Sequence, residues 1–105
     1  MMDKLKVGIL GLRRGHSHFR NFLLIDEADV IGAADRIQQW RDRAAKTAAG
    51  LDQSVRLVGE FDELLKMRPD AIVVSSNGRV QAEHTIQALE AGCHVLSEVP
   101  GAFTQ

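Results

Sequence analysis

The sequence has little cysteine, little net charge and no long apolar run, and each absence excludes a class of protein. Among its 105 residues, Cys93 is the only cysteine, so no disulfide can form within the chain, as is typical of a reducing compartment. The formal net charge of −1 gives no general attraction to nucleic acid or to an anionic membrane. The apolar runs are too short to span a bilayer, and the N-terminal residues do not form a secretory signal. We therefore expect a cytoplasmic protein with no nucleic-acid or membrane partner.

Motifs for metal binding and for nucleophilic catalysis are also absent. The four histidines include no i, i+4 pair and there is no Cys-x-x-Cys, so the sequence predicts no metal site. The serines lack the glycine pattern of a nucleophile elbow, which argues against a hydrolase triad. A response regulator needs paired acids after its first strand, where this chain has Gly-Leu-Arg-Arg at 11–14.

Short apolar segments alternate with segments of helical period along the whole chain, with no linker or repeat. The composition, 45% hydrophobic and 26% charged, is that of an ordinary globular domain, and we expect one domain over residues 1–105. The expected strands are 5–10, 29–35, 55–61, 70–76 and 94–98, and the expected helices are 15–25, 36–49, 63–67 and 80–91.

Three details of the helices can be tested against a structure. Asp62 is expected to cap the helix at 63–67. The helix at 36–49 is expected to bury Ile37, Trp40 and Ala44 and to present the arginines at 41 and 43 to solvent. In the helix at 80–91, an apolar stripe is formed by Ala82, Ile86 and Leu89.

Near-continuous apolar strands separated by helices predict a doubly wound parallel sheet. The expected fold is a three-layer α/β/α Rossmann domain with strand order 3-2-1-4-5, because right-handed crossovers favour that order. Ligands of such sheets bind at the carboxyl ends of the strands, beside the switch point between the first and fourth strands.

Residues 8–18, GILGLRRGHSH, contain part of a dinucleotide-binding turn. Gly11 allows a tight bend after the first strand, and the N-terminal end of the next helix suits a pyrophosphate. A G-x-G-x-x-G motif from Gly11 would also need glycine at 13 and 16, where the chain has Arg13 and His16. Arg13 either crowds the phosphates or swings out and neutralises them together with Arg14. The alternative is an ordinary strand-to-helix turn with two solvated arginines.

Asp35 is the second indication of nucleotide binding. It closes the second expected strand, 24 positions after Gly11, close to where the fingerprint has an acid that binds the adenosine ribose hydroxyls. An acid there repels a 2′-phosphate and favours NAD over NADP, whereas Arg36 could hold that phosphate or stack on adenine. The alternative role of Asp35 is to cap the next helix, and one carboxylate is not expected to serve both tasks easily. Gly11 and Asp35 together favour NAD without excluding NADP.

Residues 73–100, VVSSNGRVQAEHTIQALEAGCHVLSEVP, resemble the N-terminal domain of the Gfo/Idh/MocA oxidoreductase family. There the fourth strand ends in a turn like Ser-Ser-Asn, a helix follows with a histidine at the place of His84, and Gly-x-His-Val and Glu-Lys-Pro complete the pattern. KVGILGL near the N-terminus and the Glu-Leu-Leu helix fit as well, so the resemblance covers essentially the whole chain. It implies a nicotinamide-dependent oxidoreductase, often acting on sugars, polyols or related small molecules.

The resemblance also implies where the cofactor lies. The turn after the first strand would contact the pyrophosphate, the end of the second strand the adenosine, and the turn after the fourth strand the middle of the cofactor. Glu98 would approach the nicotinamide ribose. The implied cofactor-binding residues are Gly11, Leu12, Arg13, Arg14, Asp35, Arg36, Ser75, Ser76, Asn77 and Glu98. For His84, packing on the sheet and contact with the cofactor are both open.

Two departures from the family put catalysis in question. The lysine of Glu-Lys-Pro, which helps to position cofactor and substrate, is Val99 here, and the usual second glycine is Arg13. The substrate domain of the family follows this point, so we assign no catalytic residue.

Thr104 stands where a helix N-cap would begin another helix, and we expect a piece of a longer protein that binds a small-molecule substrate. The alternative is a non-catalytic nucleotide-binding or interaction module. The edge of the fifth strand predicts self-association into a homo-oligomer.

Overall fold

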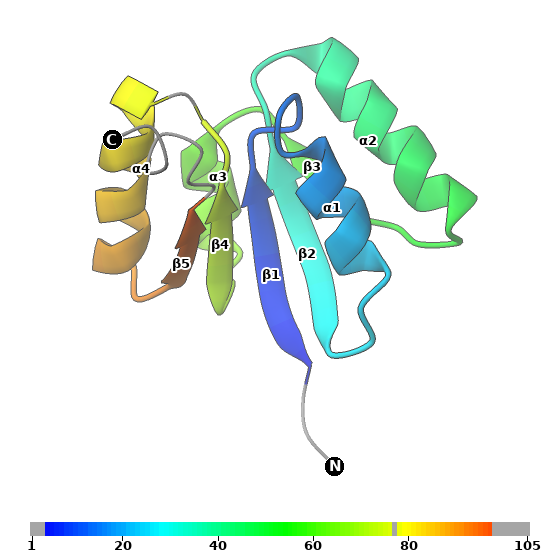
Figure 1. Cartoon of the computed structure of the whole chain (residues 1–105), viewed down its shortest axis with the longest axis horizontal. Helices are drawn as coiled ribbons and strands as arrows, with labels where there is room; N and C mark the ends of the chain where they lie inside the picture. The colour runs from blue at the N-terminus through cyan, green and yellow to red at the C-terminus, as the bar shows by residue number, and fades with distance from the viewer. Residues whose placement is uncertain (1–3, 77, 98–105) are drawn as a thin grey trace, which may run out of the picture.

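Five parallel strands form one sheet with helices on both faces (Figure 1). The computed structural model describes residues 4–76 and 78–97. In chain order the elements are β1 (Leu5–Leu10), α1 (His16–Leu23), β2 (Ala28–Ala34), α2 (Gln38–Gly50), β3 (Arg56–Val58), α3 (Phe61–Lys66), β4 (Ala71–Val74), α4 (Gly78–Glu90) and β5 (His94–Ser97). The strand order is β3-β2-β1-β4-β5, which confirms the Rossmann-like α/β fold that the sequence predicts.

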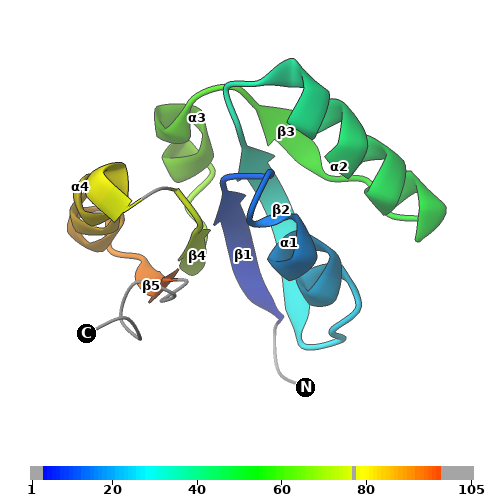
Figure 2. The same ribbon diagram turned by 45° about the horizontal axis from the view of Figure 1, so that its top comes forward.

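The sheet separates two hydrophobic cores. Successive side chains of β1 alternate between its faces, so Ile9 packs in a core with α1 and α2, whereas Leu10 packs in a core with α3 and α4. Phe19 of α1 and Leu64 of α3 are fully buried on the two faces. Figure 2 shows α1 and α2 on one side of the sheet and α3 and α4 on the other. Because helices cover both faces, a ligand has to bind at the end of the strands.

The switch point lies at the end of β1, which is flanked by β2 and β4. The amide of Gly11 donates to the carbonyl of Ala34 over 2.9 Å, and the amide of Ser75 donates to the carbonyl of Leu10 over the same distance. The first hydrogen bond joins the turn after β1 to the end of β2, and the second joins the turn after β4 to the end of β1. Residues 11 and 75, distant in sequence, therefore meet at one place in the fold.

Several element boundaries differ from the expectation by one or two residues, and the end of β3 differs most. The sequence predicts a strand over 55–61, but β3 ends at Val58 because α3 already begins at Phe61. The N-cap of α3 is Glu60 and not Asp62, so the expected cap is wrong. The amide of Glu60 donates to the carboxylate of Glu63 over 3.3 Å, which is half of a capping-box arrangement.

The apolar stripe of α4 faces away from the sheet. Ala82 is exposed, and Ile86 and Leu89 keep 55% and 57% of their surface accessible. Ala88 is buried on the sheet side of the helix in their place. The stripe is therefore a surface feature of the part of the chain that the structure describes. Over the same residues, no helix combines the length and apolar character that crossing a membrane requires.

Candidate functional site

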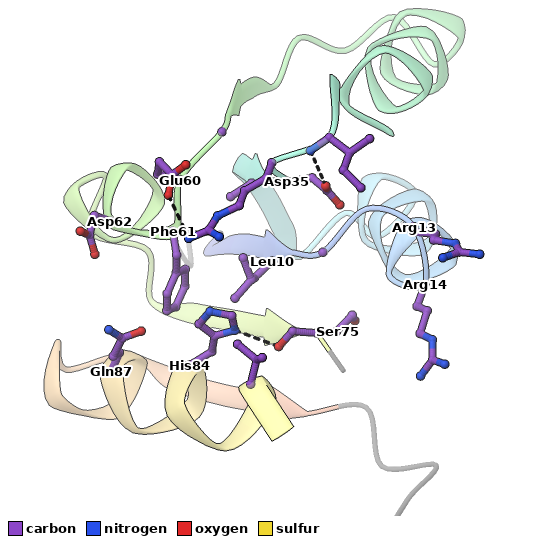
Figure 3. Close-up of a pocket in the computed structure, with 17 residues that line it drawn as sticks. Leu10, Arg13, Arg14, Asp35, Glu60, Phe61, Asp62, Ser75, His84 and Gln87 are labelled. Carbon is purple, nitrogen blue, oxygen red and sulfur yellow. Dashed lines mark hydrogen bonds and ion pairs between the residues drawn. The ribbon is translucent and has the colours of Figure 1, made fainter. Parts of the chain in front are cut away.

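A cavity of about 680 Å³ opens at the carboxyl ends of the strands (Figure 3). Its walls are the turns after β1, β2 and β4, the start of α3 and one side of α4. Seven of the ten residues that the sequence singles out line this one cavity, namely Gly11, Arg13, Arg14, Asp35, Arg36, Ser75 and Ser76. Leu12 does not line it, since its side chain is fully buried in the core under α1 and α2. Asn77 and Glu98 lie outside the described residues.

Two glycines make room for Ser75 at the bottom of the turn. Gly11 has a φ of +93°, and a Cβ atom there would lie 2.8 Å from the carbonyl oxygen of Ser75. A Cβ atom at Gly15 would overlap the carbonyl oxygen of Gly11 and lie 2.9 Å from the Cβ of Ser75. Both values are shorter than real Cβ contacts, so neither position accepts a side chain without movement of the backbone. The partial glycine motif is thus a requirement of packing at the N-terminal end of α1.

The hydroxyl of Ser75 is the orphan polar group of this cavity. The side chain is 5% exposed, and its Oγ atom has no hydrogen-bond partner among the described residues. Buried polar atoms without a partner are uncommon, and this one belongs to a residue that lines the cavity.

Arg13 does not crowd the turn, although it occupies the position of the second motif glycine. Its guanidinium group lies 5.8 Å from the centre of the Trp40 ring on α2. Figure 3 shows the side chains of Arg13 and Arg14 directed away from the middle of the cavity. The Arg13 side chain therefore points outward, and neutralisation of the phosphates together with Arg14 stays a prediction.

Asp35 has both of its carboxylate oxygens bonded to backbone amides. Oδ2 accepts a hydrogen bond from Leu12 over 2.8 Å, and Oδ1 accepts one from Ile37 over 2.9 Å. A carboxylate has about four acceptor positions, so two remain for a ligand. The N-cap of α2 is Ile37 and not Asp35, so the capping role considered for Asp35 is wrong. The hydrogen bond from the Leu12 amide to Asp35 also fixes the turn after β1.

The entrance on the α3 side is bridged by an ion pair. Nη2 of Arg36 lies 3.4 Å from Oε1 of Glu60, and both side chains are largely exposed. Arg41 of α2 donates to the carbonyl of Asp35 over 2.7 Å, which holds the end of β2 from the other side. The acidic groups Asp35, Glu60 and Asp62 all line this end of the cavity.

The sequence interpretation did not assign several lining residues to the site, among them Ile37, Phe61 and Gln87. Ile37 was expected in the core, but it precedes the first turn of α2 and is 54% exposed at the cavity. Helical periodicity gives no information about a residue that lies just outside the helix, and no other signal marked it.

His84 contacts Ser76 after β4 and Phe61 of α3, and it also lines the cavity. Its Nδ1 atom lies 2.9 Å from the hydroxyl of Ser76, and its ring makes an edge contact with Phe61 at 5.0 Å. Burial lowers the pKa of His84, and the Arg36 charge adds to this effect while Glu83 opposes it. The His84 side chain in the wall of the cavity is therefore a neutral imidazole near neutral pH.

The sequence of this domain matches a family model over almost its whole length. The model is described as the oxidoreductase family with NAD-binding Rossmann fold, and it matches residues 5–105. The chain belongs to the Gfo/Idh/MocA oxidoreductase family. The family and the cofactor class that the sequence predicts, NAD, are thereby confirmed.

Individual relatives of this Gfo/Idh/MocA chain have several activities. D-Glucoside 3-dehydrogenase of Escherichia coli (strain K12) is 54% identical over 41 residues, which are 39% of this chain and 12% of that protein. Glycosyl hydrolase family 109 protein 1 of Akkermansia muciniphila is 26% identical over 110 residues, covering 98% of this chain and 23% of the relative.

A solved structure is similar over nearly the same range. Scyllo-inositol dehydrogenase from Lactobacillus casei, with bound NAD(H) and scyllo-inositol, has a TM-score of 0.80 and 30% identity. The match covers 93% of this chain and 28% of that protein. The chain therefore spans less than a third of the length of each of these relatives.

Proposed function

We propose that residues 1–105 form the NAD-binding domain of a longer oxidoreductase that acts on a sugar, polyol or related small molecule. The observation that carries the proposal is the orphan hydroxyl of Ser75, packed between Gly11 and Gly15 at the N-terminal end of α1. Partial positive charge and free amides at a helix N-terminus favour a diphosphate. Family membership and a similar structure with NAD(H) bound support the same cofactor.

Each part of the cavity has a role in this proposal. The turn at 11–15 binds the pyrophosphate, Ser75 donates or accepts the hydrogen bond that it lacks, and Asp35 uses its two remaining acceptor positions for the adenosine ribose. Arg36 and His84 line the sides of the adenosine end. When bound, NAD accepts a hydride from a carbon that carries a hydroxyl group, or NADH returns one to a carbonyl carbon. Asn77 and Glu98, which the family resemblance places near the middle of the cofactor and the nicotinamide ribose, complete the proposed set.

NAD is the preferred cofactor in this proposal. The adenosine end is bordered by the carboxylates of Asp35, Glu60 and Asp62, which repel a 2′-phosphate. Arg36, the cation nearest to this end in the proposal, is already paired with Glu60. A 2′-phosphate would have to compete with that carboxylate.

The substrate site lies in a further part of the protein in this proposal. The relatives are at least three times as long as this chain, and we assign no catalytic residue to residues 1–105. Val99 replaces the lysine that the family resemblance implies, so a residue elsewhere would move the proton.

We also propose a cytoplasmic location, since a single cysteine is typical of a reducing compartment. Assembly into a homo-oligomer, considered below, belongs to the same proposal.

A second candidate activity is cleavage of a glycoside. It is favoured by the match over 98% of this chain to a protein named as a glycosyl hydrolase. The non-catalytic binding module remains the outcome if neither reaction occurs. An assay of the full-length protein with glycosides and cyclic polyols distinguishes the three, when NADH formation and release of the aglycone are both followed.

The cofactor proposal is tested on the chain itself. Calorimetric titration with NAD and with NADP should give binding of NAD that is at least about tenfold tighter, a difference of about 1.4 kcal/mol. Equal affinities would contradict the proposed role of the three carboxylates. Absence of binding of either dinucleotide would contradict the proposal as a whole.

A further inference from the structure

Arg43 contradicts its sequence-based interpretation as part of a solvated helix face. Its Nη2 atom donates to the carbonyl oxygen of Leu12 over 2.6 Å and to that of Arg13 over 3.1 Å. The guanidinium group also lies 4.7 Å from the centre of the Trp40 ring, the ring that Arg13 approaches as well. A side chain of α2 thus holds two successive carbonyls of the turn after β1.

We infer that Arg43 is a positioning residue that turns the amides of Arg13 and Arg14 toward the diphosphate of the dinucleotide. The inference rests on the proposed function, because it assigns a device to the same site. It concerns a residue that does not line the cavity and that acts through the backbone of the turn.

The geometry of the peptide bond carries the argument. In a trans peptide the carbonyl and the amide of the next residue point in opposite directions, and the described residues contain no cis peptide bond. Since the carbonyls of Leu12 and Arg13 point toward α2, the amides of Arg13 and Arg14 point away from it. The cavity lies on that side, because its walls come from the strand ends, α3 and α4.

The amides of the turn are divided between two tasks. The amide of Leu12 is bonded to Asp35, and the amide of Gly11 to the carbonyl of Ala34. Within residues 4–76 and 78–97, the amides of Arg13 and Arg14 have no hydrogen-bond partner. Arg43 therefore orients two of the amides that remain available for phosphate oxygens.

Thr47 connects the backbone of α2 at Arg43 to the start of α1. The hydroxyl of Thr47, one turn further along α2, donates to the Arg43 carbonyl over 3.1 Å and lies 2.8 Å from Nε2 of His16, the first residue of α1. Nε of Arg43 is buried and has no partner in the described part of the chain. This position is unfavourable for an arginine that only contributes stability. It is consistent with a guanidinium group whose place is set by the two carbonyls.

The test compares ligands with and without phosphates. ADP-ribose and adenosine are titrated into the wild-type chain, Arg43→Met, Arg43→Lys and the control Lys46→Met, which removes an exposed charge from the same helix. Arg43→Met should bind ADP-ribose about tenfold more weakly, a loss of about 1.4 kcal/mol, which is about the contribution of one charge-assisted hydrogen bond. Its affinity for adenosine, and that of Lys46→Met for both ligands, should not change. Arg43→Lys should recover part of the loss, since an ammonium group can donate to a carbonyl.

The amide chemical shifts of the turn distinguish a positioning role of Arg43 from an effect of its charge alone. In ¹H–¹⁵N spectra, ADP-ribose should shift the amide signals of Arg13 and Arg14 in the wild type and should shift them less in Arg43→Lys, which keeps the charge. Wild-type affinity for ADP-ribose in both Arg43 variants would overturn the inference, as would an equal loss of adenosine and ADP-ribose binding. If Arg43→Met does not fold, Arg43→Lys decides by the same two measurements. If the wild type binds no ADP-ribose, the proposed function falls together with this inference.

Discussion

Asp35 accepts a hydrogen bond of 2.8 Å from the amide of Leu12, although 23 positions separate the two residues. The same carboxylate also accepts the amide of Ile37, so it joins the turn after β1 to the start of α2. Asp35→Asn leaves one oxygen for two amides and should lower the free energy of unfolding by about 1–2 kcal/mol in urea denaturation. Asp29→Asn, exposed on the same strand, is the control and should have no effect. Equal stability of both variants would mean that the two hydrogen bonds contribute nothing.

Gly15 can be tested by adding a single methyl group. Gly15→Ala places a Cβ atom against the carbonyl of Gly11 and the side chain of Ser75, and should destabilise the domain by about 3 kcal/mol in thermal or urea unfolding. Gly50→Ala is the matched control, because a Cβ atom at the end of α2 meets nothing within 4 Å. That variant should stabilise the domain by about 0.5–1 kcal/mol. Similar values for the two variants would contradict the close approach.

Ser75→Ala should change the affinity for NAD without lowering the stability of the domain. The hydroxyl has no partner among the described residues, so its removal should leave the unfolding midpoint unchanged or slightly higher. The affinity for NAD should fall about three- to tenfold if a ligand supplies the missing hydrogen bond. Ser54→Ala, in an exposed loop, should alter neither quantity. Unchanged NAD affinity in Ser75→Ala would remove Ser75 from the site.

The two histidines with lowered pKa predict the pH dependence of stability. Burial is the main cause for both His16 and His84, with Arg43 the next contribution at His16. Because the folded pKa lies below the unfolded value of 6.5, the unfolded chain binds more protons between the two values. The contribution of the two histidines to stability should be constant well above pH 6.5 and should decrease as the pH falls from 6.5 toward the folded pKa. Urea midpoints of the wild type, His84→Gln and the surface control His94→Gln should show a weaker decrease for His84→Gln alone.

Self-association is expected from the surface of α4 and β5. Ile86, Leu89 and Leu96 are exposed, and β5 is an edge strand of the described sheet. Sedimentation equilibrium should show a dimer or larger species at high concentration, and Ile86→Lys combined with Leu89→Lys should shift it toward monomer. A wild-type chain that stays monomeric at high concentration would contradict the expectation.

Sequence alone predicted the fold and seven of the residues that line the cavity, since these depend on local patterns. Alternating apolar segments determine the parallel sheet, and the sheet brings Gly11, Asp35 and Ser75 to one edge whatever the details of the helices. The orientation of α4 could not be predicted this way, because periodicity identifies an apolar stripe without saying what covers it. Arg43 was missed for a related reason. Its partners are backbone carbonyls 30 or more positions away, and such partners leave no mark in the sequence.

The separation of the domain into two cores has a consequence for its folding. The turn and Trp40 belong to the layer of α1 and α2, whereas Phe61 and His84 belong to the layer of α3 and α4. A dinucleotide in the cavity would contact both layers and link them. Partial openings that release one layer alone should then become rarer in its presence, and hydrogen exchange should slow in α2 and in α4 together. Binding would thus turn two adjoining half-domains into a single cooperative unit.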